Sequence, residues 1–243
     1  MDRKMCGHAR AAVVWLSTAL GGAAVGCGPE QVAFDVEQDE DGRPTLAPLE
    51  DNTAQWPAEA DGESHPEVLE VATPAGAPAP GWAHARGYLH AGIAEVWEAM
   101  RDPDVVVNKE NAVSYRLKGE CDLQGLAYCF EYESTVDIPV APVDLESVTM
   151  WRHFLKEGEM EAPEEVVVVY KSTENPPGIE LATGSLELIK IDEETTGVAF
   201  IGWLDTWGSD AGNTDAMVDY ANNLFDAACD YVHDSGCPGL VRE

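Results

Sequence analysis

The chain contains few basic residues. Its 243 residues include 14 lysines and arginines against 45 aspartates and glutamates, which gives a formal net charge of −31. Residues 1–26 hold three of the basic residues and one acidic residue, so a chain that begins at Cys27 has 44 acidic and 11 basic residues and a charge of −33. Proteins bind nucleic acid through basic side chains that displace counterions from the phosphates, so this composition excludes nucleic acid as a partner. It also excludes a basic patch that would draw the protein to anionic lipid.

The sequence also lacks the short motifs by which many catalytic and metal sites are recognised. It contains no G-x-S-x-G, no phosphate-binding loop, no H-E-x-x-H and no dinucleotide-binding G-x-G-x-x-G. A D-x-D-x-D-G calcium loop is absent as well. We therefore expect no metal, no cofactor and no recognisable set of catalytic residues.

The N-terminus has the order of a secretory signal peptide. Three basic residues fall within the first ten positions, an apolar run covers residues 11–20, and small residues lead up to Cys27. The run is short for a membrane span, whereas its length and flanks are typical of a signal sequence. A cysteine at the cleavage position resembles a bacterial lipoprotein signal, so we expect residues 1–26 to be removed and Cys27 to be lipidated.

Two neighbouring residues bear on this interpretation. Ala24 stands where lipoprotein signals usually have leucine, which leaves plain secretion or an uncleaved anchor open. Gly28 follows Cys27 in place of the aspartate that retains some lipoproteins at the inner membrane. We expect an exported protein attached through its lipid anchor to the cell envelope, at the outer membrane.

Residues 27–81 have the composition of a tether. Positions 28–80 contain 13 acidic residues, eight prolines and a single arginine. High charge and abundant proline oppose a packed core and extend the chain, so this stretch is predicted to be disordered. Short apolar stretches at residues 32–36 and 68–71 are alternatives, as local docking segments.

Residues 82–236 have the regular apolar spacing of one folded domain, followed by a short tail at 237–243. A period of two predicts strands, and a period of three to four predicts helices. Gly184 is expected to mark a bend or bulge within its strand. The predicted strands are residues 82–90, 112–119, 127–138, 146–156, 164–172, 179–191 and 197–208. The predicted helices are residues 93–100, with a further turn at 103–107, and a long amphipathic helix at 214–233.

Six cysteines are present, of which Cys6 and Cys27 belong to the signal region. The other four are even in number in an exported chain, which favours disulfides. Their sequential pairs share one spacing, which predicts Cys121–Cys129 and Cys229–Cys237. A zinc site is the alternative, but the short cysteine pairs and nearby histidines of such sites are missing.

Two stretches resemble a known family. "HAGIAEVWEAMRDPDVV", from His90, is similar to the first strand-to-helix junction of the START-like or SRPBCC superfamily, and "GVAFIGWLDTWGSDAGNTDAMVDYANNLF", from Gly197, is similar to its last strand and C-terminal helix. The resemblance covers residues 82–236 and implies an α+β, helix-grip fold, in which a curved antiparallel sheet wraps a long C-terminal helix. Members carry lipids, sterols or polyketides in the cavity between them, or use it as an active site. The family has no universal catalytic residues, so none is carried over.

The large side chains of the late strands and the helix are candidates for lining such a cavity. The alternative is that they fill the core, because one register slip exchanges the faces of a strand. The candidate ligand-binding residues are Trp151, His153, Tyr170, Trp203 and Tyr220.

Three functions are therefore open. The leading one is a membrane-tethered module that binds a hydrophobic small molecule or lipid without catalysis. The second is a cyclase- or hydrolase-type enzyme that uses the same pocket, with His153 paired to Asp205 or Glu133 as an unsupported acid–base candidate. The third is a structural interaction protein of the envelope with a filled core.

Overall fold

The structure is a computed structural model. It describes residues 30–31, 37–38, 44–60, 62–75, 80–107, 112–121, 125–137, 144–176, 178–207 and 210–233. The signal peptide, Cys27 and the tail at 237–243 lie outside these residues, so the expectations for them stay predictions. Among the described helices, none is both long and apolar enough to span a membrane.

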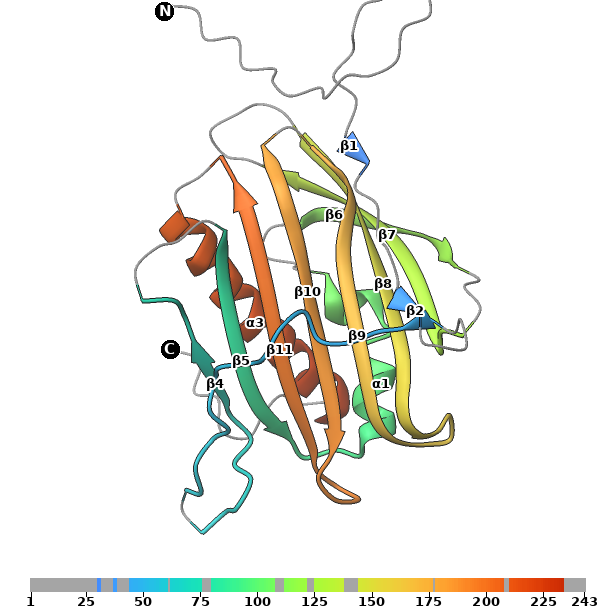
Figure 1. Ribbon diagram of the computed structural model, residues 1–243, viewed down its shortest axis with the longest axis vertical. Helices are drawn as coiled ribbons and strands as arrows, with labels where there is room; N and C mark the ends of the chain where they lie inside the picture. The colour runs from blue at the N-terminus through green and yellow to red at the C-terminus, as the bar shows by residue number, and fades with distance from the viewer. Residues whose placement is uncertain are drawn as a thin grey trace, which may run out of the picture.

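The described residues form one nine-stranded antiparallel sheet (Figure 1). Its order is β4-β5-β11-β10-β9-β8-β7-β6, and β1 pairs with the end of β9. The strands are β1 (Glu30–Gln31), β4 (Leu69–Ala72), β5 (Gly81–Leu89), β6 (Ala112–Glu120), β7 (Tyr128–Asp137), β8 (Asp144–Glu159), β9 (Ala162–Asn175), β10 (Ile179–Lys190) and β11 (Thr196–Thr206). A separate two-stranded pair joins β2 (Glu37–Gln38) to β3 (Pro44–Thr45). The predicted strands are thus confirmed, with boundary shifts of a few residues.

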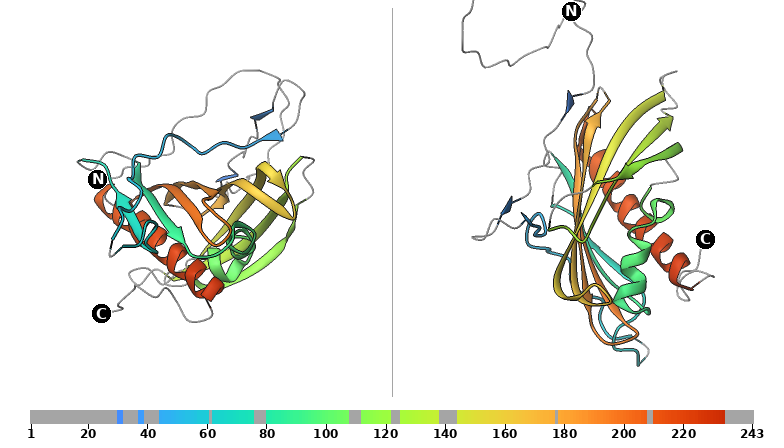
Figure 2. Two further views of the ribbon diagram at one scale, coloured as in Figure 1. Left: turned by 90° about the horizontal axis from the view of Figure 1, so that it is seen from below. Right: turned by 90° about the vertical axis from the view of Figure 1, so that its right-hand side faces the viewer.

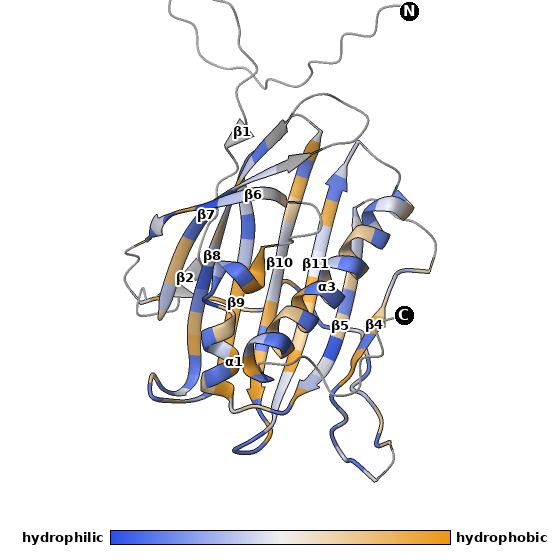
Figure 3. Ribbon diagram, turned by 180° about the vertical axis from the view of Figure 1, so that it is seen from behind, coloured by the Kyte–Doolittle hydropathy of each residue, from blue (hydrophilic) through white to orange (hydrophobic). Residues whose placement is uncertain are grey.

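The long helix α3 (Asp210–His233) lies across one face of the curved sheet, together with α1 (Ile93–Ala99) and α2 (Pro103–Val106) (Figure 2). We call this the inner face and the opposite one the outer face. The α+β arrangement of a curved antiparallel sheet around a C-terminal helix is confirmed. α3 shows both hydrophilic and hydrophobic residues along its length (Figure 3), as its amphipathic spacing predicts.

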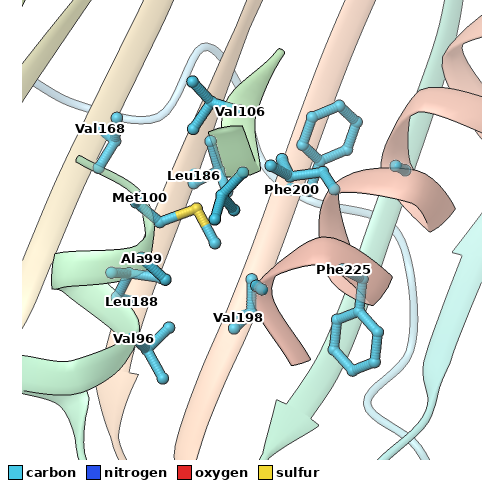
Figure 4. Packing of buried hydrophobic residues seen from close by; sticks show 14 of the residues in the cluster. Val96, Ala99, Met100, Val106, Val168, Leu186, Leu188, Val198, Phe200 and Phe225 are labelled. Atoms are coloured by element: carbon cyan, nitrogen blue, oxygen red, sulfur yellow. The ribbon is translucent and has the colours of Figure 1, made fainter. Parts of the chain in front are cut away.

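The main core lies between the inner face and the three helices. It joins Val96 and Met100 of the α1 region to strand residues such as Leu186 and Val198, and to Phe225 of α3 (Figure 4). The four consecutive valines of β9 show that both faces of the sheet are covered. Val166 and Val168 belong to the main core, while Val167 and Val169 pack with Leu46 on the outer face. A continuous apolar run is what a strand buried on both faces requires.

The covering of the outer face corrects the prediction of a disordered tether for the described residues 44–60 and 62–75. Residues 44–60, which we call the N-terminal segment, run across the outer face (Figure 1), and β4 adds an edge strand to β5. The predicted start of the domain at Trp82 is therefore wrong. Apolar outer-face residues and strand carbonyls offer this segment partners that its own composition does not reveal.

Hydrogen bonds fix the N-terminal segment at a buried histidine. The backbone N–H of Thr53 donates to His84 Nδ1 at 2.9 Å, so Nε2 carries the ring proton and donates to Glu50 Oε1 at 2.8 Å. Asn52 donates to the carbonyls of Ala85 and Phe200 at 3.1 and 2.9 Å. This face is thus closed by polar contacts as well as by Leu46.

One predicted disulfide is present, and the other is partly outside the described residues. Cys121 and Cys129 are bonded, with their Cα atoms 5.2 Å apart. Cys229 is disulfide-bonded as well, but Cys237, its predicted partner, is not among the described residues. A cysteine in a disulfide cannot bind zinc as a thiolate, so Cys121, Cys129 and Cys229 are not zinc ligands in this structure.

Candidate functional site

A cavity of about 210 Å³ lies between the inner face and the first half of α3. We call it the inner cavity. It is bordered by residues of β7 to β11 and of α3, close to the end of the sheet that carries the β9–β10 turn. The lining residues are Tyr132, Thr149, Tyr170, Ala182, Thr183, Trp203, Leu204, Ala216, Met217 and Tyr220.

The inner cavity arises where one row of side chains across the inner face includes small residues, among them Thr149. The row below it contains Phe130, Trp151 and Tyr170, which oppose one another on β7, β8 and β9. In the next row towards the β9–β10 turn, Tyr132 opposes Thr149, and Thr149 opposes Ser172. On β8 and β9, the small side chains of Thr149 and Ser172 therefore follow the large rings of Trp151 and Tyr170. Space remains between this part of the sheet and α3.

A glycine on β5 allows the start of α3 to lie against the sheet. A Cβ at Gly81 would lie 2.5 Å from the backbone nitrogen of Thr214, so β5 and the start of α3 are in direct contact.

Gly184 was expected to form a bulge, but it stays in register with Tyr170 and Gly202. Its lack of a side chain makes room for the Tyr170 ring, with which a Cβ would overlap.

The inner cavity is uncharged. None of its ten described lining residues is a carboxylate, an amine, a guanidinium, an imidazole or a thiol. Burial raises the pKa of Tyr132, and it raises the pKa values of Tyr170 and Tyr220 well above 10. These phenols stay protonated at neutral pH. The lining therefore offers apolar carbon and neutral hydrogen-bonding groups.

The hydroxyls of two cavity tyrosines differ in their partners. Tyr220 donates to the Val106 carbonyl at 2.9 Å. The hydroxyl of Tyr170 is buried, and no group in the described part of the chain pairs with it. A buried hydroxyl without a partner loses its hydration, which costs folding free energy.

Three of the five predicted ligand-binding residues border the inner cavity, namely Tyr170, Trp203 and Tyr220. Trp203 differs from the other two. Its indole N–H donates to Glu50 Oε1 at 2.8 Å, and Glu50 belongs to the N-terminal segment on the outer face. Strand side chains alternate between faces, and the adjacent Gly202 faces Met217 of α3. The Trp203 side chain therefore belongs to the outer face.

Trp151 and His153 lie outside the cavity lining, in the core. Trp151 is fully buried and stacks on Tyr170 with a centroid distance of 4.8 Å. His153 Nδ1 accepts a hydrogen bond from the Trp97 indole N–H at 3.1 Å. Burial, with a smaller contribution from the Arg101 charge, lowers the pKa of His153 to about 3. This histidine is neutral at physiological pH, and the structure shows no contact with Asp205 or Glu133 among its described interactions.

The small residues of the cavity lining were not among the predicted ligand-binding residues. Thr149, Ala182 and Ala216 leave the space, and Tyr132, Leu204 and Met217 enclose it. Small residues carry no signal of their own in the sequence. Thr149 lies on β8, Ala182 on β10 and Ala216 on α3, so only the assembled fold brings them together.

A second group of side chains joins the segment before β4 to the end of α3. Glu67, Cys229 and His233 have ligand-type atoms within 4.8 Å of one another. The Cys229 sulfur is disulfide-bonded, and Glu67 Oε1 lies 2.7 Å from both His233 Nε2 and the backbone N–H of His90. These bonds engage Glu67 Oε1, whereas Oε2 has no hydrogen-bond partner among the described residues. Because the Cys229 sulfur is in a disulfide and cannot serve as a thiolate ligand, we interpret the group as a structural contact.

No protein-family model matches the sequence, and no curated protein matches it. Solved structures do match the fold. A STAR-related lipid transfer protein from Xanthomonas axonopodis is 13% identical, covers 74% of this chain and 99% of its own, and gives a TM-score of 0.51. The lipid transfer and protein localization domain of human StarD13 is 11% identical over 70% of this chain and 87% of its own, with a TM-score of 0.50. Human STARD10 is 9% identical over 67% and 70%, with a TM-score of 0.50. The chain has the START-like, helix-grip fold.

Proposed function

We propose that this protein is a START-like module that binds a hydrophobic small molecule or lipid in the inner cavity and does not catalyse a reaction. The uncharged lining of the cavity is the observation that carries the proposal. An apolar pocket with a few polar groups is the usual form of a small-molecule site. The lipid-transfer proteins among the structural neighbours support a ligand of this kind.

The volume of the cavity limits the ligand. Sites for drug-sized ligands usually measure about 300–1,000 Å³, and the inner cavity measures about 210 Å³. It therefore suits a small apolar molecule, or one chain of a larger lipid. Its lining also disfavours the enzyme alternative, because general acid–base catalysis needs a group that titrates near neutral pH.

The same proposal includes a lipid anchor at Cys27 and a place at the outer membrane. β1 supports a definite geometry for this anchor, because Glu30 pairs with Asn175 at the end of β9. Cys27 precedes Glu30 by three residues, a reach of at most about 11 Å. The anchor would then hold the cavity end of the sheet next to the bilayer. Cys27→Ser should move the protein from the membrane to the soluble fraction, and retention at the membrane would contradict the anchor.

Two matched variants of α3 test the binding claim. Ala216 lines the inner cavity, whereas Ala227 is likewise partly buried on the same helix but packs against the core elsewhere. Titration of the full chain with the uncharged probe N-phenyl-1-naphthylamine should show saturable fluorescence. Ala216→Phe should abolish this binding because its ring fills the cavity, and Ala227→Phe should retain it. Equal binding by the two variants would place the probe elsewhere and overturn the proposal.

A further inference from the structure

A second hollow, of about 430 Å³, lies on the outer face between the sheet and the N-terminal segment. We call it the outer hollow. On its floor, Ala199 of β11 is paired with Glu187 of β10 and with Arg86 of β5, so a methyl group lies between two long charged side chains. Its volume is within the range of about 300–1,000 Å³ that is usual for small-molecule sites. The rest of its lining comes from the neighbouring row of the sheet and from the N-terminal segment, namely Ser185, Ile201, Pro48, Glu50, Asp51 and Asn52.

Arg86 is a cation without an anionic partner in a strongly acidic protein. Its guanidinium carbon lies 5.1 Å from the centroid of the Trp56 ring, and no hydrogen bond or ion pair joins it to another described residue. Nε is buried, whereas the two terminal nitrogens are not. By contrast, glutamates pair with Arg116, Lys118, Lys156 and Lys190. Arg86 therefore presents an open guanidinium to the outer hollow, and this group pairs best with a carboxylate.

The two neutral polar side chains of the outer hollow are engaged with the protein. Asn52 donates to two strand carbonyls and accepts from the backbone N–H of Ala54 at 2.9 Å. Ser185 Oγ accepts from the backbone N–H of Leu49 at 3.1 Å, so only its hydroxyl hydrogen remains. These bonds hold the N-terminal segment on the sheet, and they leave charged side chains as the main groups that a ligand would meet.

Three carboxylates also line the outer hollow. Glu50 Oε1 accepts two N–H groups, and Glu187 Oε1 lies 3.3 Å from Lys156 Nζ. Asp51 is exposed. These carboxylates do not converge on a metal ion, because the one group of three potential ligands found among the described residues lies elsewhere. Together with the net charge of −31, they repel a ligand that carries negative charge alone.

We propose that the outer hollow binds a small zwitterion, with the chemistry of a free amino acid. Its carboxylate pairs with the guanidinium of Arg86, and its ammonium group faces Asp51 and Glu187. Pro48 and Ile201 contact its apolar part. A ligand with both charges supplies the missing partner of the guanidinium without adding net negative charge to an acidic hollow. This site lies on the opposite face of the sheet from the inner cavity and does not depend on the proposed function.

L-Leucine and two derivatives test the need for both charges. Calorimetric titration of the full chain at pH 7 compares leucine with leucinamide, which lacks the carboxylate, and with N-acetyl-leucine, which lacks the ammonium group. We expect leucine to bind at least about tenfold more tightly than either derivative, because each derivative loses one charge-assisted contact. A derivative that binds as tightly as leucine would overturn the zwitterion. Absence of leucine binding would overturn the site.

Two arginine variants test the contact itself. Arg101 is the matched control, because its guanidinium also stacks on a tryptophan, Trp97 at 4.8 Å, and its Nε is also buried without a partner, but it does not line the outer hollow. Arg86→Gln should weaken leucine binding at least about tenfold, and Arg101→Gln should leave it unchanged. Arg86→Gln should keep N-phenyl-1-naphthylamine binding in the inner cavity, which reports an intact fold. Leucine affinity that is unchanged in Arg86→Gln, or equally reduced in both variants, would refute the contact.

Discussion

The two faces of the sheet are covered in different ways. The inner face meets a long helix, packs aromatic rings and retains an uncharged cavity of about 210 Å³. The outer face meets an extended segment and retains a polar hollow of about 430 Å³. That hollow is lined by Pro48, Glu50, Asp51, Asn52, Arg86, Ser185, Glu187, Ala199 and Ile201.

Each face also contains one fully buried histidine, and the two histidines show what the covering element supplies. His84 on the outer face bonds Thr53 and Glu50 of the N-terminal segment. His153 on the inner face accepts one bond from Trp97, and its other nitrogen has no partner among the described residues. An extended segment brings free backbone and carboxylate groups to a sheet, whereas a helix has already used its backbone groups internally. The inner face is therefore suited to apolar ligands.

The largest expected effect comes from His153 and depends on pH. Its folded pKa, about 3, is below its ordinary value of 6.5, so the unfolded chain binds more protons and stability falls as pH drops from about 6.5. This group alone should cost about 3 kcal/mol of unfolding free energy by pH 4. His153→Asn, which keeps an acceptor for Trp97, should remove that part of the acid dependence. Urea unfolding at several pH values measures it. An identical pH dependence for the parent and His153→Asn would show that His153 is not held neutral by burial.

The next effect compares glycines on the two faces. Gly81→Ala places a Cβ against the backbone of Asn213 and Thr214, so the whole start of α3 must shift. We expect a loss of about 2 kcal/mol, as for overpacking at a rigid site. Gly197→Ala meets the tip of the Trp56 ring at 2.9 Å, in the N-terminal segment. A side chain at the edge of a segment can move, so its loss should be below about 1 kcal/mol. Equal losses in thermal unfolding would show that the outer covering is as rigid as the helix.

A smaller effect is expected from the attachment of the N-terminal segment. Glu50 Oε1 accepts from both His84 and Trp203 at 2.8 Å. Glu50→Ala should cost about 1 kcal/mol and speed proteolysis within residues 44–60, while ligand binding in the inner cavity is retained. The adjacent Asp51→Ala is the control and should leave the cleavage rate unchanged. Loss of cavity binding in Glu50→Ala would mean that the two faces are coupled.

The same comparison explains which features the sequence predicted. The helix at 214–233 and the seven strands follow from side-chain period, a local property, and the structure confirms them with α3 extended back to Asp210. The Cys121–Cys129 bond closes a short loop and is local as well. The docking of residues 44–60 is not local. Leu46 has no visible partner until Val167 and Val169 lie together on the outer face.

Only part of the candidate site was predicted, because the face and the row of a strand residue are also not local properties of the sequence. Tyr170 and Tyr220 were selected by size and border the cavity, but Trp151 and His153, chosen in the same way, lie in the core. Size alone does not give the face or the row of a strand residue. The register shift in β10 between Ile179 and Leu181, and those between β8 and β9, decide which residues meet. The space itself comes from the small side chains of Thr149, Ala182 and Ala216, which only the assembled fold brings together.

Native mass spectrometry tests the central claim most directly. The full chain, purified from its producing cells and incubated with their organic extract, is compared with Ala216→Phe. We expect a single hydrophobic small-molecule adduct on the parent protein, released by solvent and absent from Ala216→Phe. A parent protein that shows only its own mass, or an adduct that persists in Ala216→Phe, would contradict binding in the inner cavity.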